Sequence, residues 1–217
     1  MPMRKIKTEP VTSARGGGSR EAIVAAAQRL FLQRGFGAVS MDELAENAGV
    51  ARRTLYNQFT SKEEIFREML SALSRQLEGA FPAGVETSGN VEEVLRFVAR
   101  TILDLHTHPE YLGFLRMVVA DSRQFPWIAK EFAAVMDPQT ERLRRFLAHA
   151  TELGLLDCRN PLLAAHQLMG MLNEFSLWPW MVGRPPIPIR REELAEEATQ
   201  MFLQRYLPKS RSGGKRP

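Results

Sequence analysis

From residue 19 to residue 206, apolar residues recur every three or four positions. No stretch shows the sustained alternation of apolar and polar residues that marks a half-buried strand. A period near 3.6 places apolar side chains on one face of a helix, so each segment needs neighbouring helices to cover that face. The sequence therefore predicts an all-α fold of about nine helices.

The second and third predicted helices are short, and the ends of the first three carry strong signals. Ser19 is expected to cap the first helix. Ser40 and Glu43 have the spacing of a capping box, in which a hydroxyl and a carboxylate bind free amides at a helix start. Gly49 supplies the positive φ of a tight turn. The third helix lies in residues 50–59, which read VARRTLYNQF.

This third helix exposes more hydrogen-bonding side chains than packing explains. Leu55 and Phe59, four residues apart, are the two positions expected to face the core. Two short helices joined by a glycine turn, after a longer amphipathic helix, make a helix-turn-helix unit. Its second helix enters the major groove of DNA. Arg52 and Arg53 can bind guanine O6 and N7 or phosphate, and the sequence leaves both readings open.

The net charge of +4 is concentrated at one end of the chain. Residues 1–60 contain nine Lys and Arg against five Asp and Glu, whereas residues 61–207 carry a net charge of −4. The positive charge of residues 1–60 suggests that this part of the chain alone binds a polyanionic partner. A solubilising tail is the alternative, because four of the nine basic residues lie in residues 1–18, a segment ending in RGGGS and expected to be a flexible basic arm.

Residues 19–70 resemble the DNA-binding domain of the TetR family of bacterial regulators. The resemblance is carried by Gly35-Phe36, Ser40 to Ala45, Ala48-Gly49-Val50, Thr54-Leu55-Tyr56, Phe59 and Ser61-Lys62-Glu63. In the rest of the chain, HPEYLGFLRMVVADSRQFP and NEFSLWPW resemble the subset with an AefR-like C-terminal half.

The family resemblance implies a homodimer that binds a palindromic double-stranded DNA operator, usually as a repressor, and releases it when a small molecule binds the body. Carried over by position, it implies DNA contacts from Ser40, Arg52, Arg53, Thr54, Tyr56, Asn57, Gln58 and Lys62. The expected phosphate contacts are Thr54, Tyr56 and Lys62, and the candidates for base readout are Arg52, Arg53 and Asn57. Gln58 departs from the histidine that many relatives have there, yet its amide can still donate to a phosphate.

The predicted domain organisation has four segments. Residues 1–18 form the arm, 19–64 the helix-turn-helix DNA-binding domain, 65–207 a larger helical ligand-binding and dimerisation domain, and 208–217 a basic tail. Within the larger domain, the long helix that starts at Pro126 is expected to bend or break near Pro138.

The larger domain supplies candidates for binding an apolar or amphipathic small molecule. Phenylalanine and methionine can line an adaptable cavity, and a few polar groups would orient the ligand. The candidates are His106, Phe114, Met117, Phe132, Met136, His166, Met169 and Asn173, each of which also fits an ordinary structural role. Helices at about 161–178 and 190–206 are more apolar than one core face needs, which predicts an isologous four-helix interface between two subunits.

Other classes of protein find little support in the sequence. HTHPE at residues 106–110 fits neither a zinc-protease helix nor a Cys/His finger, and no nucleophile elbow or phosphate loop occurs. The single Cys158 excludes an internal disulfide and a cysteine metal site, and no cofactor is expected. No apolar run approaches 18 residues and no secretory leader is present, which favours a cytoplasmic protein. A DNA-binding regulator is the preferred interpretation; the alternatives are a small-molecule enzyme with a helical body and a non-specific DNA-coating protein.

Overall fold

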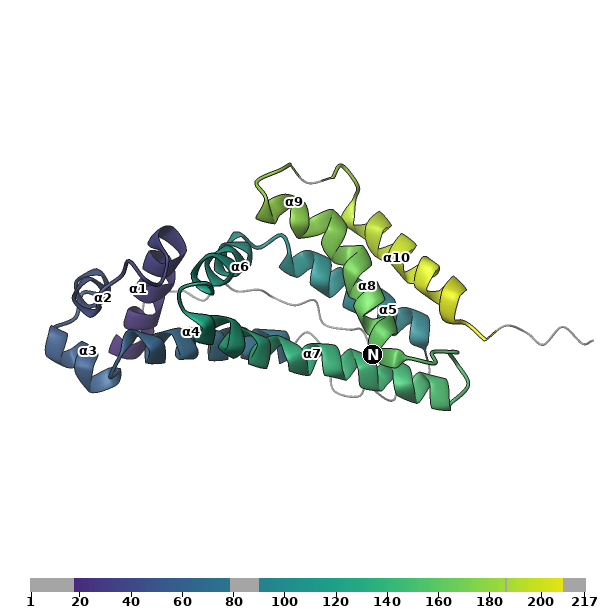
Figure 1. Ribbon diagram of the computed structural model, residues 1–217, viewed down its shortest axis with the longest axis horizontal. Helices are drawn as coiled ribbons and strands as arrows, with labels where there is room; N and C mark the ends of the chain where they lie inside the picture. Colours follow the sequence, from purple (N-terminus) through teal and green to yellow (C-terminus); the bar gives the residue numbers. More distant parts are fainter. Residues whose placement is uncertain (1–17, 79–89, 186, 209–217) are drawn as a thin grey trace, which may run out of the picture. The chain divides into compact units, whose positions relative to one another are not determined.

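The computed structural model describes residues 18–78, 90–185 and 187–208. Within these ranges the chain forms ten helices and no strand, which confirms the all-α class (Figure 1). The predicted arm up to residue 17 and the predicted tail from residue 209 lie outside the described residues. The helices are α1 (Ser19–Arg34), α2 (Met41–Ala48), α3 (Arg52–Gln58), α4 (Lys62–Glu78), α5 (Val91–Leu105), α6 (Pro109–Asp121), α7 (Pro126–Glu152), α8 (Pro161–Ser176), α9 (Trp178–Met181) and α10 (Arg191–Tyr206).

These helices belong to two compact units. The first unit comprises residues 1–80 and 107–139, and so contains α1 to α4, α6 and the first part of α7. The second comprises residues 81–106 and 140–217, with α5, the rest of α7, and α8 to α10. The first unit therefore extends beyond the predicted helix-turn-helix segment of residues 19–64.

Aromatic rings fill the core of the first unit. The Phe36 ring, which is fully buried, lies 5.2 Å from that of Phe31 and 5.7 Å from that of Phe66. Tilted and edge-on ring pairs at such distances are favourable beyond the area they bury. Leu55 and Phe59 are also buried, which confirms them as the residues that anchor α3 to this core.

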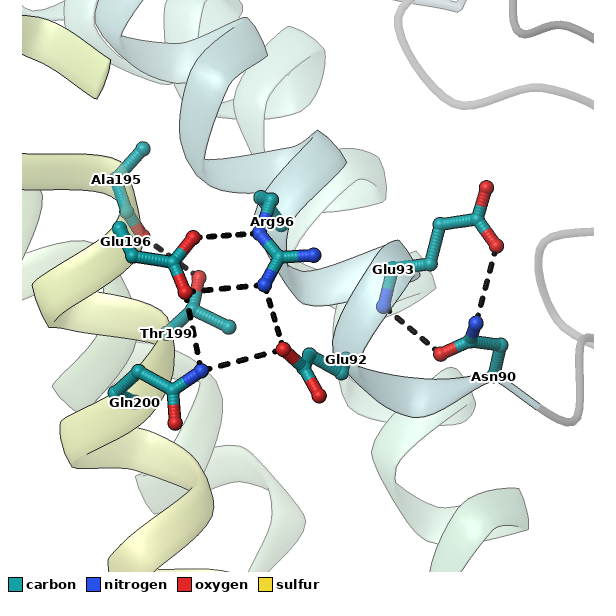
Figure 2. Close-up of polar contacts among 8 residues, drawn as sticks. All are labelled: Asn90, Glu92, Glu93, Arg96, Ala195, Glu196, Thr199 and Gln200. Atoms are coloured by element: carbon teal, nitrogen blue, oxygen red, sulfur yellow. Dashed lines mark hydrogen bonds and ion pairs between the residues drawn. The ribbon is translucent and has the colours of Figure 1, made fainter. Parts of the chain in front are cut away.

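In the second unit, α5, α8, α10 and the end of α7 enclose a separate core. A cluster of charged and polar side chains crosses from α5 to α10 at its edge (Figure 2). Arg96 donates to Glu196 through Nε at 2.7 Å and also binds Glu92, while Gln200 donates to both carboxylates. We call Glu92, Arg96, Glu196 and Gln200 the α5–α10 cluster. Arg96 keeps the pKa of Glu196 low, at about 2, with help from Gln200.

Three details differ from the sequence predictions. Gly18, not Ser19, occupies the N-cap of α1, and the Ser19 hydroxyl instead accepts a hydrogen bond from Gln58. The helix α7 continues through Pro138, so the predicted break does not occur, and a bend there stays a prediction. Proline removes one N–H and displaces the carbonyl of residue 134, and both positions are exposed, so water can satisfy the freed group. The segment predicted as one helix to Trp178 ends at Ser176 and is followed by the four-residue α9.

Candidate nucleic-acid interface

The start of α2 carries the predicted capping box. Ser40 Oγ accepts from the Glu43 N–H at 3.3 Å, and Glu43 Oε2 accepts from the Ser40 N–H at 2.8 Å. Arg34 adds an ion pair to Glu43 at 2.7 Å. The Ser40 amide, followed by Arg34, lowers the pKa of Glu43 to about 2, so this carboxylate stays charged at neutral pH. The other end of α2 has Gly49 at φ 66°, as the tight turn requires.

The apolar side chain of α3, Leu55, is buried in the core, and the outer surface of the helix is therefore formed by polar side chains. Arg52, Arg53, Tyr56 and Asn57 are exposed, and Thr54 is half-buried. We call these five residues the α3 surface. It offers two guanidinium forks, two hydroxyls and one amide within two turns of helix, a set that can bind phosphate oxygens and base edges.

The structure distinguishes the two arginines, which the sequence left equivalent. Arg52 forms an ion pair with Asp42 of α2 at 2.9 Å, and both side chains are well exposed. Arg53 contacts no partner within the described part of the chain. An exposed pair of this kind is worth little in water, so the Arg52 fork is oriented but not immobilised. The pairing of Asp42 with Arg52 was not predicted, because the sequence carries no signal for it.

Gln58 differs from the rest of α3, because it contacts the start of α1. Its amide donates to Ser19 Oγ at 3.3 Å, and its backbone carbonyl accepts from Arg20 at 3.0 Å. The Arg20 guanidinium also lies 4.1 Å above the centre of the Phe59 ring. Arg20 therefore holds the end of α3, a role with no local signal in the sequence. A phosphate contact from Gln58 stays a prediction.

The ammonium of Lys62, at the start of α4, also has partners within the chain. It donates to the carbonyl oxygens of Phe36 and Val39, each at 3.0 Å, and lies 4.5 Å from the centre of the Phe36 ring. The residue thus braces the segment between α1 and α2. A phosphate contact from Lys62 stays a prediction.

The candidate ligand-binding residues divide between the two units. In the first unit, Phe114 and Met117 are buried, Phe132 and Met136 are half-buried, and the rings of Phe114 and Phe132 are 6.1 Å apart. The second unit contains the other four: His106 is buried, Met169 and Asn173 are half-buried, and His166 is exposed.

Two polar groups of the second unit have distinctive surroundings. Burial lowers the pKa of His106 to about 4, so the ring is neutral at neutral pH. Ser176 Oγ donates its one hydrogen to the Leu172 carbonyl at 2.7 Å, and His106 Nδ1, also 2.7 Å from that oxygen, must therefore donate to it. Asn173 differs, because its buried Oδ1 has no hydrogen-bond partner within the described residues.

The described residues hold no group of three or more His, Cys, Asp or Glu placed to bind a metal ion. Cys158 is buried, and this burial is the main reason why the pKa of its thiol is raised to about 11. None of the described helices is both long enough and apolar enough to cross a membrane.

Comparisons with known proteins agree with this arrangement of helices. The family model "Bacterial regulatory proteins, tetR family" matches residues 23–69, and the model "AefR-like transcriptional repressor, C-terminal domain" matches residues 93–208. The transcriptional regulator EthR of Mycolicibacterium smegmatis is 40% identical over 72 residues, and this match spans 33% of each chain.

Two solved structures are similar over most of their length. The flavonoid-responsive regulator FrrA is 30% identical with a TM-score of 0.74, and the match covers 88% of this chain and 98% of that one. A TetR family transcriptional regulator from Pseudomonas syringae is also 30% identical, with a TM-score of 0.70 and coverage of 91% and 100%.

Proposed function

This chain belongs to the TetR family of bacterial regulators, and from that premise we propose that it is a ligand-responsive, DNA-binding transcriptional repressor. The observation that carries the proposal is the α3 surface. Two arginines, a tyrosine and an asparagine are exposed on a seven-residue helix that a capping box, a glycine turn and two buried anchors hold in place. Exposed donors of this kind add little to the stability of the chain, whereas a polyanionic duplex offers acceptors for them.

Within this surface we assign different tasks to the side chains. Thr54 and Tyr56 would donate to phosphate oxygens and set the register of α3 on the duplex. Arg53, which has no partner in the described part of the chain, would present its fork to a guanine. Asp42 would hold Arg52 near its working orientation until DNA replaces the carboxylate as its partner.

We further propose a homodimer formed through α8 and α10. One face of α8 is buried in its own core, through Ala164, Ala165, Leu168 and Leu172, yet Leu162 and Leu163 are about half exposed. Gly170 on this helix has open space around it, which permits a second helix to approach closely. On α10, Met201 is 58% exposed. A two-fold axis through these helices would pair both α3 helices with the two halves of a palindrome.

The proposed effector is an amphipathic small molecule with a hydroxyl group. Asn173 supplies the reason, because its buried Oδ1 is an acceptor that lacks a donor within the described residues, and such a group is costly unless a ligand or water satisfies it. The similar protein FrrA is described as flavonoid-responsive, which makes a hydroxylated flavonoid a suitable first probe. Binding to the state with lower DNA affinity would release the operator.

A selection experiment tests the proposal as a whole. Purified protein would be used to enrich sequences from a random double-stranded DNA library, and the best sequence compared with a scrambled version at one salt concentration. A repressor of this family should enrich a palindrome and prefer it strongly. Equal affinity for the scrambled duplex would contradict sequence-specific regulation and favour the DNA-coating alternative.

A further inference from the structure

The turn between α1 and α2, residues 35–40, is held by charged side chains from other elements. Asp121, the last residue of α6, accepts from the Phe36 N–H through Oδ2 at 2.7 Å. Its carboxylate lies flat against Gly35, where an added Cβ would be 3.3 Å from both carboxylate oxygens. Gly35 also has φ +81°. Glycine is needed here for two reasons: the backbone conformation and the close approach of the carboxylate.

Basic side chains bind the carbonyl groups of the same turn. Lys62 donates to the carbonyl oxygens of Phe36 and Val39 at 3.0 Å, and Arg34 donates to that of Ala38 at 3.1 Å. Side chains thus satisfy backbone groups of the turn up to the residue at which the Ser40 capping box opens α2. The position of that helix start consequently depends on these few charge-assisted hydrogen bonds.

The residues that follow Asp121 pack on the turn as well. The Phe125 ring is 5.3 Å from the Phe36 ring, and a Cβ on Gly37 would come within 3.0 Å of it. The Trp127 ring lies 5.1 Å from Phe36. Close packing on this side means that the end of α6 and the α1–α2 turn cannot shift independently by much without losing these contacts.

We infer that Asp121 is a positioning residue for DNA binding: its hydrogen bond to Phe36 fixes where α2 begins and thereby orients the α2–α3 pair. Asp121 belongs to the segment that matches the AefR-like C-terminal domain, whereas Phe36 belongs to the DNA-binding segment. This contact is therefore a direct route by which a change in α6 reaches α2. The predicted effect on DNA binding rests on the proposed function, whereas the predicted effect of Asp121 on the start of α2 does not depend on it.

The test uses the full-length protein and four variants. Asp121→Ala removes the acceptor, whereas Asp121→Asn keeps an acceptor oxygen on a side chain of the same length. Arg123→Ala changes an exposed residue two positions after Asp121, between α6 and α7. Val98→Ala removes two methyl groups from the core of the second unit and serves as a purely destabilising control. Hydrogen exchange of residues 36–48 and affinity for the duplex selected by the wild-type protein are measured at a temperature where every variant is folded.

The inference predicts that Asp121→Ala speeds exchange in residues 36–48 and weakens DNA binding by about tenfold, since hydrogen bonds to charged acceptors carry that order of energy. Asp121→Asn keeps an acceptor but loses the charge, so it should recover about half of the lost free energy and bind DNA about threefold more weakly than wild type. Arg123→Ala and Val98→Ala should leave both unchanged, although Val98→Ala lowers the unfolding temperature.

Wild-type exchange and affinity in Asp121→Ala, or losses equal to those of Val98→Ala, would overturn the inference. If Asp121→Ala does not fold, Asp121→Glu, which keeps the charge but moves the carboxylate by one methylene, is judged by the same two readouts. If the wild-type protein selects no DNA sequence, the proposed function fails, and the exchange of residues 36–48 still decides whether Asp121 fixes the start of α2.

Discussion

The α3 surface and the α5–α10 cluster both place arginine on the outer face of a helix, but their partners differ. In the cluster, Arg96 binds Glu92 and Glu196, and Gln200 completes the set (Figure 2). On the α3 surface, Arg53 has no partner in the described part of the chain, and Arg52 has only an exposed carboxylate. Donors satisfied within the chain contribute to stability, whereas open donors are available to a ligand.

The comparison predicts that changing an arginine affects DNA binding in one region and stability in the other. Arg53→Ala should give the largest effect, a loss of about 1 to 3 kcal/mol in affinity for the selected duplex and a relaxed preference at one base pair. Thermal unfolding should barely change, because the side chain is exposed. Competition binding against single-base variants of the duplex provides the measurement. An equal loss on every duplex would assign Arg53 to phosphate instead.

Lys62 sharpens the comparison, because its ammonium has partners within the chain and a predicted partner in DNA. Lys62→Ala should weaken binding to every duplex by about tenfold. It should also reduce the slope of log affinity against log salt concentration by about one. The unfolding temperature should also fall, since the carbonyl oxygens of Phe36 and Val39 lose their donor. A lower unfolding temperature with an unchanged salt slope would show that Lys62 serves the α1–α2 turn alone.

Local signals explain why some of these features could be predicted from the sequence. The Ser40–Glu43 box and the Gly49 turn join residues at most four apart, so their spacing reveals them. The anchors Leu55 and Phe59 follow from helical periodicity. The same local rules could not tell whether α7 breaks at Pro138, since they do not show which side of a helix faces water.

Contacts between distant residues could not be predicted in this way. Asp121 binds Phe36 across 85 positions, and Arg96 binds Glu196 across 100, with no motif that marks either pair. Residue type and helical face are the two signals in the sequence that point to the candidate ligand residues. These residues therefore fall into both units of the structure, because residue type does not encode which helices come together.

His106 extends the comparison to pH, because it is a buried polar group satisfied within the second unit. Its pKa is lowered to about 4 from 6.5, so below pH 6.5 the unfolded chain binds a proton that the folded chain does not. Stability should therefore fall as pH decreases from 6.5 towards 4, by up to about 1.4 kcal/mol per pH unit. Denaturant unfolding at several pH values measures this slope. His106→Gln should flatten it; an unchanged slope in that variant would assign the pH dependence to other groups.

The smallest expected effect concerns the α5–α10 cluster itself. Arg96→Met should lower the free energy of unfolding by about 1 kcal/mol, because Glu92 and Glu196 lose the guanidinium that they share. The effect is small because water partly screens both ion pairs. The matched control is Arg144→Ala, which breaks a surface pair within α7 and should cost less. Affinity for the selected duplex should stay at the wild-type value in both. A tenfold loss of DNA affinity in Arg96→Met would remove the distinction between the two regions.

The central claim is that the open donors of α3 recognise a DNA sequence. Its most direct test is the affinity of the wild-type protein for the selected palindrome and for a scrambled duplex, measured by fluorescence anisotropy at the same physiological salt concentration. We predict a preference of about 1,000-fold or more for the palindrome. Equal binding to both duplexes would contradict the claim.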